Sequence, residues 1–437
     1  MTRPQSREPG RWTRLLQERP RLLGAWCLVA AFGTYACMYG FRKPFTAAPF
    51  EAAPFGAGMK ALFVLSQVMG YTTSKWLGIR VIGEMPPERR VGTLLGLVAV
   101  AEGALILFGF LPPPYGCLPM FINGLSLGMV FGLVLGFLEG RRMTEMFVAG
   151  VCASFIVADG ATKSAGAFLL EMGVPERWMP SACGMLFLLP LLWFVGMLRN
   201  IPAPSDADVA ARSERPALSR GERRLFLIRY APGLGAITIA YVVVTILRSV
   251  RADFAPELWA GLGSPGPPAV FTTSELWVAA GVLGINGLTV TLRDNRRALL
   301  SAITVSCLGL LLVVLVIAAQ GVGQISAFPF MVLLGLGLYL PYVAVHTTLF
   351  ERLIAMTRER ANVGHLMYVA DTAGYLGYLG VMVGRWTMSD GDPGISGILN
   401  LGAGCALFGL LAMLLAALWL SRLCRRNPSH PPTPALG

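Results

Sequence analysis

The chain has 437 residues, of which 55% are hydrophobic and 14% are charged, and its mean hydropathy is +0.62. A soluble globular domain averages about 25% charged residues, so a single water-soluble core is excluded. The net charge is +12, but no nucleic-acid-binding motif accompanies it, and basic residues on such a chain typically mark cytoplasmic loops. We therefore predict an all-α polytopic membrane protein that has the lipid bilayer as its surroundings and no nucleic-acid partner.

Apolar stretches long enough for a bilayer-crossing helix of about 20 residues recur along the chain. Proline- and glycine-rich breaks separate them, for example Pro112 to Pro114 and Gly391 to Gly394. The pattern predicts about twelve transmembrane helices. They cover roughly residues 23–49, 58–81, 91–111, 117–139, 144–170, 178–198, 227–251, 271–292, 297–318, 326–350, 362–386 and 396–421.

The distribution of arginine supports this number of helices. Arginines gather in alternate loops: Arg80, Arg89, Arg90, Arg141, Arg142, Arg293, Arg296, Arg297, Arg352, Arg358 and Arg360. The intervening loops hold few basic residues, chiefly Arg177 and Arg385. A missed or an extra helix would invert the alternation, so we expect a cell-membrane protein with both termini in the cytoplasm.

The longest polar break, residues 200–226, divides the predicted helices six and six. It is rich in Arg, Asp, Glu, Pro and Ser, which is typical of a linker. Two six-helix bundles joined by a basic loop favour the major facilitator architecture, in which the halves are parallel repeats. The expected domains are a cytoplasmic tail at 1–22, bundles at 23–199 and 227–421 around the cytoplasmic linker, and a cytoplasmic tail at 422–437.

The N-terminal residues and the cysteines indicate neither a cleaved leader nor a metal site. Residues 1–22 carry several arginines, and no small-residue cleavage pattern follows them, so the first apolar stretch is expected to remain a membrane span. The eight cysteines are scattered without a Cys-x-x-Cys pair and are interpreted as small apolar residues. We predict no metal site and no cofactor.

Arg42 and Lys43 lie near the far end of the first predicted helix. Charges at membrane depth are costly and mark binding sites or ion paths. The alternative is that both side chains extend to the lipid headgroups from a helix end. This alternative applies more to Lys43, which is turned about 100° around a helix from Arg42.

A short repeat connects the two halves. Tyr35 precedes Arg42 by seven residues, and Tyr241 precedes Arg248 by the same spacing. Seven residues are about two helical turns, so each tyrosine is predicted to share a helix face with its arginine. The chain has only four lysines, and Lys75 is one of those in a predicted span. We therefore interpret Arg42, Arg248 and Lys75 as a candidate anion-binding cluster.

Other charged or titratable residues in the spans carry two interpretations each. Asp159 and Lys163 are spaced to neutralise each other on one helix face, or to take part in coupling. Glu102 is either a protonated packing residue or a proton carrier, and Asp371 has the same ambiguity. Glu275 lies near a helix start, where an interfacial position is the simpler interpretation. His346 is interpreted as a hydrogen-bonded core residue, with a proton relay as its alternative.

Four short segments carry a resemblance to a known family. They are Tyr35 to Phe45 with its Arg-Lys pair, Tyr71-Thr72-Thr73-Ser74-Lys75, Tyr241 to Arg248 followed by Asp253-Phe254-Ala255-Pro256, and Gly374 to Gly380. Together they resemble the organophosphate:inorganic-phosphate antiporters of the major facilitator superfamily. The resemblance implies that Arg42 and Arg248 hold a phosphate group, with Lys75, Lys43, Tyr35, Tyr39, Tyr71 and Tyr241 beside them.

The sequence departs from that family in two places. Ser154 stands where the family has a histidine, and Asp159 and Lys163 are additional charges. The superfamily's Asp-Arg signature after the second helix is reduced to a displaced Glu84. We interpret the chain as a divergent branch of the superfamily, with its substrate open.

The expected function is secondary-active, alternating-access transport of a small organic or phosphorylated anion, by exchange for phosphate or with proton coupling. Asp159, Lys163, Glu102, Asp371 and His346 are the candidates for coupling. A transporter-like sensor that binds the anion without moving it is the alternative. An enzyme is not expected, because the sequence has no Gly-x-Ser-x-Gly motif and no His-rich set with ligand spacing. We expect a monomer.

Overall fold

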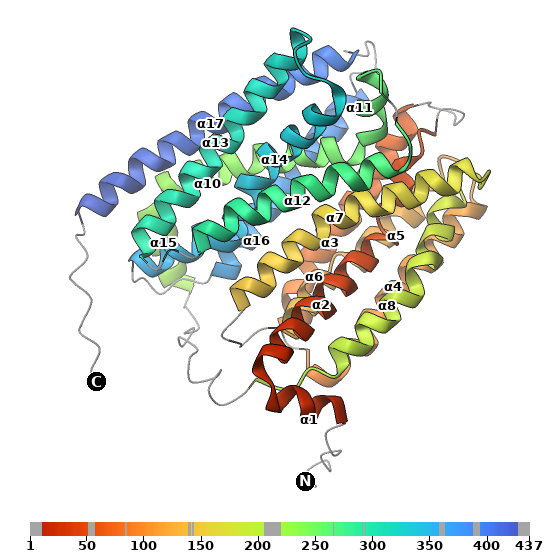
Figure 1. Ribbon diagram of the computed structural model, residues 1–437, viewed down its shortest axis with the longest axis horizontal. Coiled ribbons are helices and arrows are strands. Elements are labelled where there is room, and N and C mark those ends of the chain that lie inside the picture. The colour runs from red at the N-terminus through yellow and green to blue at the C-terminus, as the bar shows by residue number, and fades with distance from the viewer. Residues whose placement is uncertain are drawn as a thin grey trace.

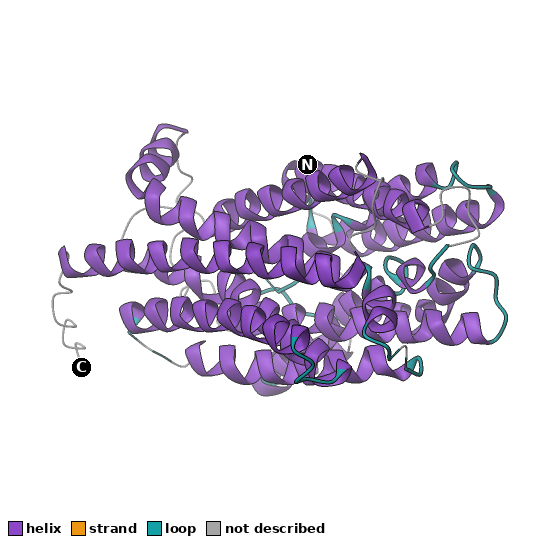
Figure 2. Cartoon of the chain, turned by 90° about the horizontal axis from the view of Figure 1, so that it is seen from above, coloured by secondary structure: helices purple, strands orange, loops and turns teal. Residues whose placement is uncertain are grey.

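The computed structural model of the protein describes residues 11–50, 57–83, 85–138, 141, 144–204, 220–264, 266–290, 292, 294–357, 363–387 and 394–426. Helices dominate this part of the chain, and Figure 2 shows them without any strand among the described residues. A helix satisfies its own backbone hydrogen bonds, which is the requirement that a bilayer imposes on a single segment. The all-α prediction is confirmed.

The first half is built from helices that pack with one another along the bundle. A short amphipathic helix, α1 (Arg11–Glu18), lies within the predicted tail and packs on α2. The others are α2 (Pro20–Tyr39), the 3₁₀ helix η1 (Pro44–Ala47), α3 (Ala57–Gly83), α4 (Pro87–Phe110), α5 (Cys117–Leu127), α6 (Val130–Gly136), α7 (Thr144–Glu171) and α8 (Met179–Arg199).

The second half repeats this organisation. Its elements are α10 (Arg220–Asp253), α11 (Ala255–Gly261), α12 (Ala269–Val290), α13 (Asn295–Gly321), α14 (Ala327–Ala344), the π-helical segment η2 (Val345–Leu349), α15 (Phe350–Thr357), α16 (Val363–Thr387) and α17 (Gly394–Arg426). The start of α2 and the end of α17 lie at the same end of the bundle in Figure 1. We call this end the terminal side and the other end the opposite side.

Ten of the described helices are long and apolar enough to cross a membrane. The other two long ones, α3 and α16, have 27 and 25 residues, which also exceeds bilayer thickness. They pack against each other between the halves, as α7 and α12 also do. Helices at this interface carry polar and charged residues, because their neighbours are protein and not lipid. The twelve predicted spans thus each correspond to a long helix or a broken pair of helices among the described residues.

Several helix boundaries differ from the prediction. The first span was expected to continue to residue 49, but α2 ends at Tyr39, and Pro44 begins a separate 3₁₀ turn. A proline cannot donate the next helical hydrogen bond, and Gly40 before it favours a break. The fourth span is divided between α5 and α6. In the predicted linker, residues 205–219 lie outside the described part, and α10 already begins at Arg220.

Candidate functional site

Arg42 lies in the turn that follows α2, and two amide side chains hold this turn. Gln67 of α3 donates to the carbonyl oxygen of Arg42 at 2.8 Å, and Asn123 of α5 donates to that of Phe41 at 2.9 Å. Gln67 also donates to Asn123 at 2.8 Å. Carbonyl groups at the end of a helix lack helical partners, so these amides replace the missing donors. The guanidinium of Arg42 lies 3.8 Å from the centre of the Tyr71 ring.

Arg248 is presented by α10, near the middle of the molecule. Its guanidinium lies 4.4 Å from the Tyr342 ring centre and 5.8 Å from that of Tyr339. The aromatic faces attract the cation without neutralising it. Arg42 and Arg248 are only 4% and 8% exposed, so neither extends into lipid headgroups, and the alternative for Arg42 is wrong.

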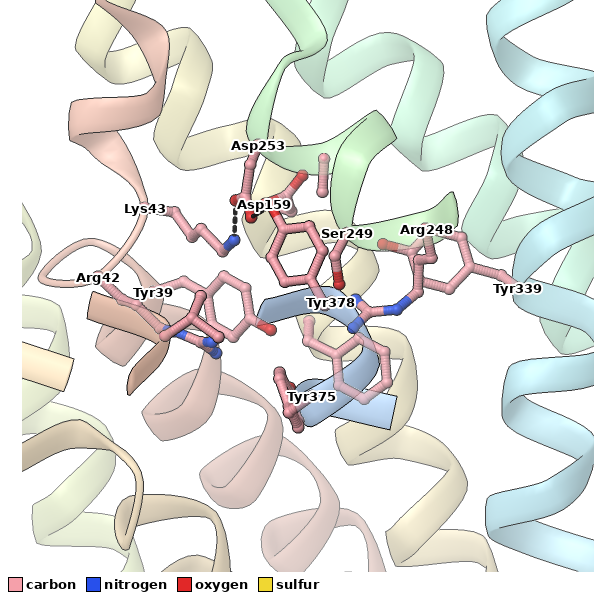
Figure 3. A pocket seen from close by; sticks show the side chains of 13 residues that line it. Tyr39, Arg42, Lys43, Asp159, Arg248, Ser249, Asp253, Tyr339, Tyr375 and Tyr378 are labelled. Atoms are coloured by element: carbon pink, nitrogen blue, oxygen red, sulfur yellow. Dashed lines mark hydrogen bonds and ion pairs between the residues drawn. The ribbon is translucent and has the colours of Figure 1, made fainter. Parts of the chain in front are cut away.

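Both arginines line one small pocket between the halves (Figure 3). They reach toward each other from the two sides of the pocket, with tyrosines between them. The cavity measures about 20 Å³, which is room for about one water molecule. The polar side chains around it are Tyr39, Arg42, Lys43, Asp159, Arg248, Ser249, Asp253, Tyr339, Tyr375 and Tyr378.

Ion pairs neutralise the other basic side chains of the membrane-embedded region. The pairs are Lys43 with Asp253, Lys60 with Glu257, Lys75 with Asp371, Lys163 with Asp159, and Arg251 with Glu275. Within the described part of the chain, no carboxylate is within ion-pair distance of Arg42 or Arg248. The Nε atom of each is buried without a hydrogen-bond partner. The pocket therefore contains two cations that the protein itself does not compensate.

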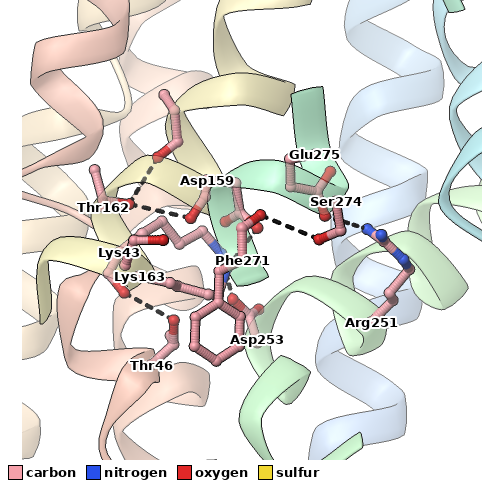
Figure 4. A network of polar contacts seen from close by, with 12 residues as sticks. Lys43, Thr46, Asp159, Thr162, Lys163, Arg251, Asp253, Phe271, Ser274 and Glu275 are labelled. Carbon is pink, nitrogen blue, oxygen red and sulfur yellow. Dashed lines mark hydrogen bonds and ion pairs between the residues drawn. The ribbon is translucent and has the colours of Figure 1, made fainter. Parts of the chain in front are cut away.

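Lys43 is buried beside the pocket and does not reach a headgroup. It forms its ion pair with Asp253, which also accepts a hydrogen bond from Tyr378 at 2.7 Å. Because Lys43 is 8% exposed, the lipid-interface interpretation of this residue is wrong. Figure 4 shows Lys43 and Asp253 next to Asp159 and Lys163. This network closes the pocket on the opposite side.

Lys75 does not line the pocket, contrary to the expected three-cation cluster. Its ammonium group contacts the Asp371 carboxylate of α16 at 2.5 Å, because α3 and α16 pack together there. Tyr241 also lies outside the pocket and donates a hydrogen bond to Asp371. It therefore does not accompany Arg248, although the two share α10.

The remaining tyrosines of the prediction lie around Arg42. Tyr39 lines the pocket, while Tyr35 and Tyr71 lie behind it. Tyr35 and Arg42 do not share a helix face, because α2 ends between them. Tyr35 instead packs edge-on against Tyr39, with ring centres 5.6 Å apart.

The candidates for coupling are dispersed. Asp159 and Lys163 form the expected pair on α7. Glu102 accepts a hydrogen bond from Ser181 at 2.6 Å, and its other carboxylate oxygen has no partner. His346 is buried and joins Asp371 near the terminal side of the interface. Their roles in coupling stay predictions.

The sequence interpretation missed several pocket residues. Asp253 was in a matched segment, but its ion pair with Lys43 joins residues 210 positions apart, which a short motif does not reveal. Arg251 and Glu275 form a buried bridge at 2.7 Å, so Glu275 is not interfacial. Tyr339, Tyr375 and Tyr378 reach the pocket only through helix packing. No group of three potential metal ligands occurs among residues that the structure describes.

Comparison with known proteins places the chain in a family. Residues 44–422 match the model of a family of unknown function, DUF5690. The chain belongs to the DUF5690 family. None of the curated proteins matches the DUF5690 sequence significantly.

Solved structures show which fold the DUF5690 chain adopts. The xylose:proton symporter XylE bound to 6-bromo-6-deoxy-D-glucose is similar with a TM-score of 0.62 and 13% identity, over 92% of this chain and 95% of that one. The peptide transporter PepTSo gives 0.60 and 14%, over 94% and 99%. A point mutant of the nucleoside transporter NupG gives 0.59 and 14%, over 90% and 99%. The DUF5690 protein therefore has the major facilitator fold.

Proposed function

We propose that this protein is a secondary-active transporter of a small organic or phosphorylated anion, which binds between Arg42 and Arg248. The supporting observation is that these two buried arginines come from opposite halves, face one cavity and have no carboxylate partner among the described residues. Buried like charges are unfavourable. An anion between two guanidinium forks compensates both and binds them with charge-assisted hydrogen bonds.

The position of the site supports alternating access as the mechanism. An anion that bridges the halves lowers the electrostatic cost of closing them together, and so favours a closed, loaded state. With room for about one water molecule, the cavity admits a larger anion only after the halves separate. The empty site is the less favourable one to close, so exchange of one anion for another follows from this charge arrangement.

Binding of the anion is tested first with purified protein. Inorganic phosphate, organophosphates and dicarboxylates are screened by thermal shift, where a ligand at 100 times its Kd adds about 2.7 kcal/mol of stability. Arg42→Lys and Arg248→Lys lose the two-pronged contact, and we expect binding to weaken by about 1.5–3 kcal/mol. Arg19→Lys, at an exposed arginine before α2, is the matched control. Unchanged anion affinity in both site variants would contradict the proposal.

Transport is tested separately in proteoliposomes. Vesicles loaded with a stabilising anion should take up its labelled form, and either arginine variant should reduce that uptake more than Arg19→Lys does. Stabilisation by an anion without any flux would instead favour the sensor. The fold shared with sugar, nucleoside and peptide transporters supports the transporter.

A further inference from the structure

We infer that His346 is a proton-binding site whose occupancy is linked to opening of the interface on the terminal side. This inference rests on the alternating-access function proposed above. It concerns a second polar cluster, in which Lys75, Asp371, Tyr241 and His346 meet away from the arginine pocket.

The Asp371 carboxylate is the centre of this cluster. One oxygen, Oδ2, accepts from the Lys75 ammonium at 2.5 Å. The other, Oδ1, accepts from the Tyr241 hydroxyl and lies 3.5 Å from Nε2 of His346. Lys75 belongs to the first half, whereas Asp371, Tyr241 and His346 belong to the second. Only the lysine contact therefore crosses between the halves.

The hydrogen bonds of His346 fix where an added proton goes. Its Nδ1 lies 2.9 Å from the carbonyl oxygen of Tyr342, and a carbonyl only accepts, so Nδ1 carries a hydrogen. In the neutral ring Nε2 is then unprotonated. This atom faces the Asp371 carboxylate and the Tyr241 hydroxyl, each at 3.5 Å. A second proton would bind at Nε2, next to the negative charge.

Separation of the halves changes the charge beside this nitrogen. When Lys75 moves away with the first half, Asp371 keeps only neutral partners in a largely buried place. A proton on His346 then supplies the missing cation from within the second half. In the closed arrangement Lys75 already compensates Asp371 and repels that proton. The open state consequently binds the proton more tightly, and acid pH favours opening.

The surroundings link this proton site with the anion pocket. The Tyr342 ring lies 4.6 Å from the His346 ring and 4.4 Å from the Arg248 guanidinium. His346 also lies in the π-helical segment η2, and such segments are frequent at functional sites. Elements packed on η2 carry further titratable or charged residues: Cys152 on α7, Cys307, Arg296 and Arg297 on α13, Tyr339 on α14, and Glu351 and Arg352 on α15.

The experiment follows opening directly, without any anion. Spin labels are placed on the terminal side at two exposed positions, Glu88→Cys of α4 and Arg296→Cys of α13, in full-length protein reconstituted in lipid. Their distance distribution is measured between pH 8.5 and 5.5 in wild type, His346→Gln and the matched control His365→Gln. The labels report the ratio of open to closed molecules.

We expect this ratio to rise with falling pH in wild type and in His365→Gln, by up to about tenfold per pH unit, the limit for one proton. In His346→Gln the dependence should disappear. If His346→Gln does not fold, Asp371→Asn serves, because removal of the carboxylate also removes the reason for proton binding. A ratio that ignores pH in wild type, or that responds equally in the histidine or carboxylate variant, overturns the inference. The readout is independent of the arginine pocket, so a failure of anion binding leaves it unaffected.

Discussion

Individual side chains give Arg42 a fixed position although it lies beyond the end of its helix. Asn123 donates to two carbonyl oxygens, those of Phe41 at 2.9 Å and Ala101 at 3.2 Å, and it accepts from Gln67. Asn123 is fully buried, so every one of these bonds is shielded from water. The amide pair therefore ties the arginine turn to α3, α4 and α5.

At this scale we predict that Asn123→Leu lowers both stability and anion affinity. The substitution leaves buried carbonyl groups without a donor, at a cost of about 1–3 kcal/mol, and frees the turn that carries Arg42. Melting temperature and anion Kd are the measurements. Ser126→Ala, on the same helix, removes only a bond to the carbonyl of Asn123 within α5 and is the control. Equal effects of the two substitutions on Kd would contradict a positioning role for Asn123.

At the scale of elements, α3 and α5 cross in backbone contact. A Cβ atom on Gly124 would lie 1.9 Å from the backbone oxygen of Gln67, and one on Gly70 would lie 2.0 Å from that of Phe121. Small residues permit this close packing between membrane helices. The crossing also brings Gln67 of α3 to Asn123 of α5, so the arginine turn depends on it.

We predict that Gly124→Ala destabilises the protein, whereas Gly103→Ala does not. The first substitution forces two backbones apart, and overpacking of this kind costs about 1–3 kcal/mol. A Cβ atom on Gly103 meets nothing within 4 Å, and alanine is the better helix former. Thermal unfolding in detergent compares them. Similar melting temperatures for both variants would show that the α3–α5 contact adapts.

Helix identity was largely predictable from the sequence, and helix breaks were less so. Bilayer-length apolar stretches and alternating arginines located the spans, because both follow from the membrane itself. The end of α2 at Tyr39 depends on Gln67 and Asn123, which are far away in sequence. Likewise Arg42 and Arg248 were recognisable by their depth, but Lys75 was assigned to them because its partner Asp371 lies 296 positions away.

Across the described part of the whole molecule, three ion pairs join the halves on both sides of the arginine pocket. Lys43 with Asp253 and Lys60 with Glu257 lie toward the opposite side, and Lys75 with Asp371 lies toward the terminal side. In each pair the first half supplies the lysine and the second half the carboxylate. Both sides are therefore closed in this structure, as in an occluded state of a transporter.

We predict that Lys60→Gln shifts the molecule toward opening on the opposite side. The substitution removes the cation that holds Glu257, whereas Lys60→Glu combined with Glu257→Lys restores an ion pair of reversed direction. Label distances across that side are the measurement. Lys163→Gln is the control, because its partner Asp159 is on the same helix and the pair holds no interface. An unchanged distance in Lys60→Gln would show that this pair does not hold the two halves together.

The pairing of the four lysines has a practical consequence. Lys43, Lys60, Lys75 and Lys163 are the only lysines in the chain, and each is engaged by a carboxylate. An amine-reactive reagent followed by mass spectrometry would therefore read the conformation of unmodified protein. Acetylation of Lys43 and Lys60 reports the opposite side, acetylation of Lys75 reports the terminal side, and Lys163 provides the internal reference.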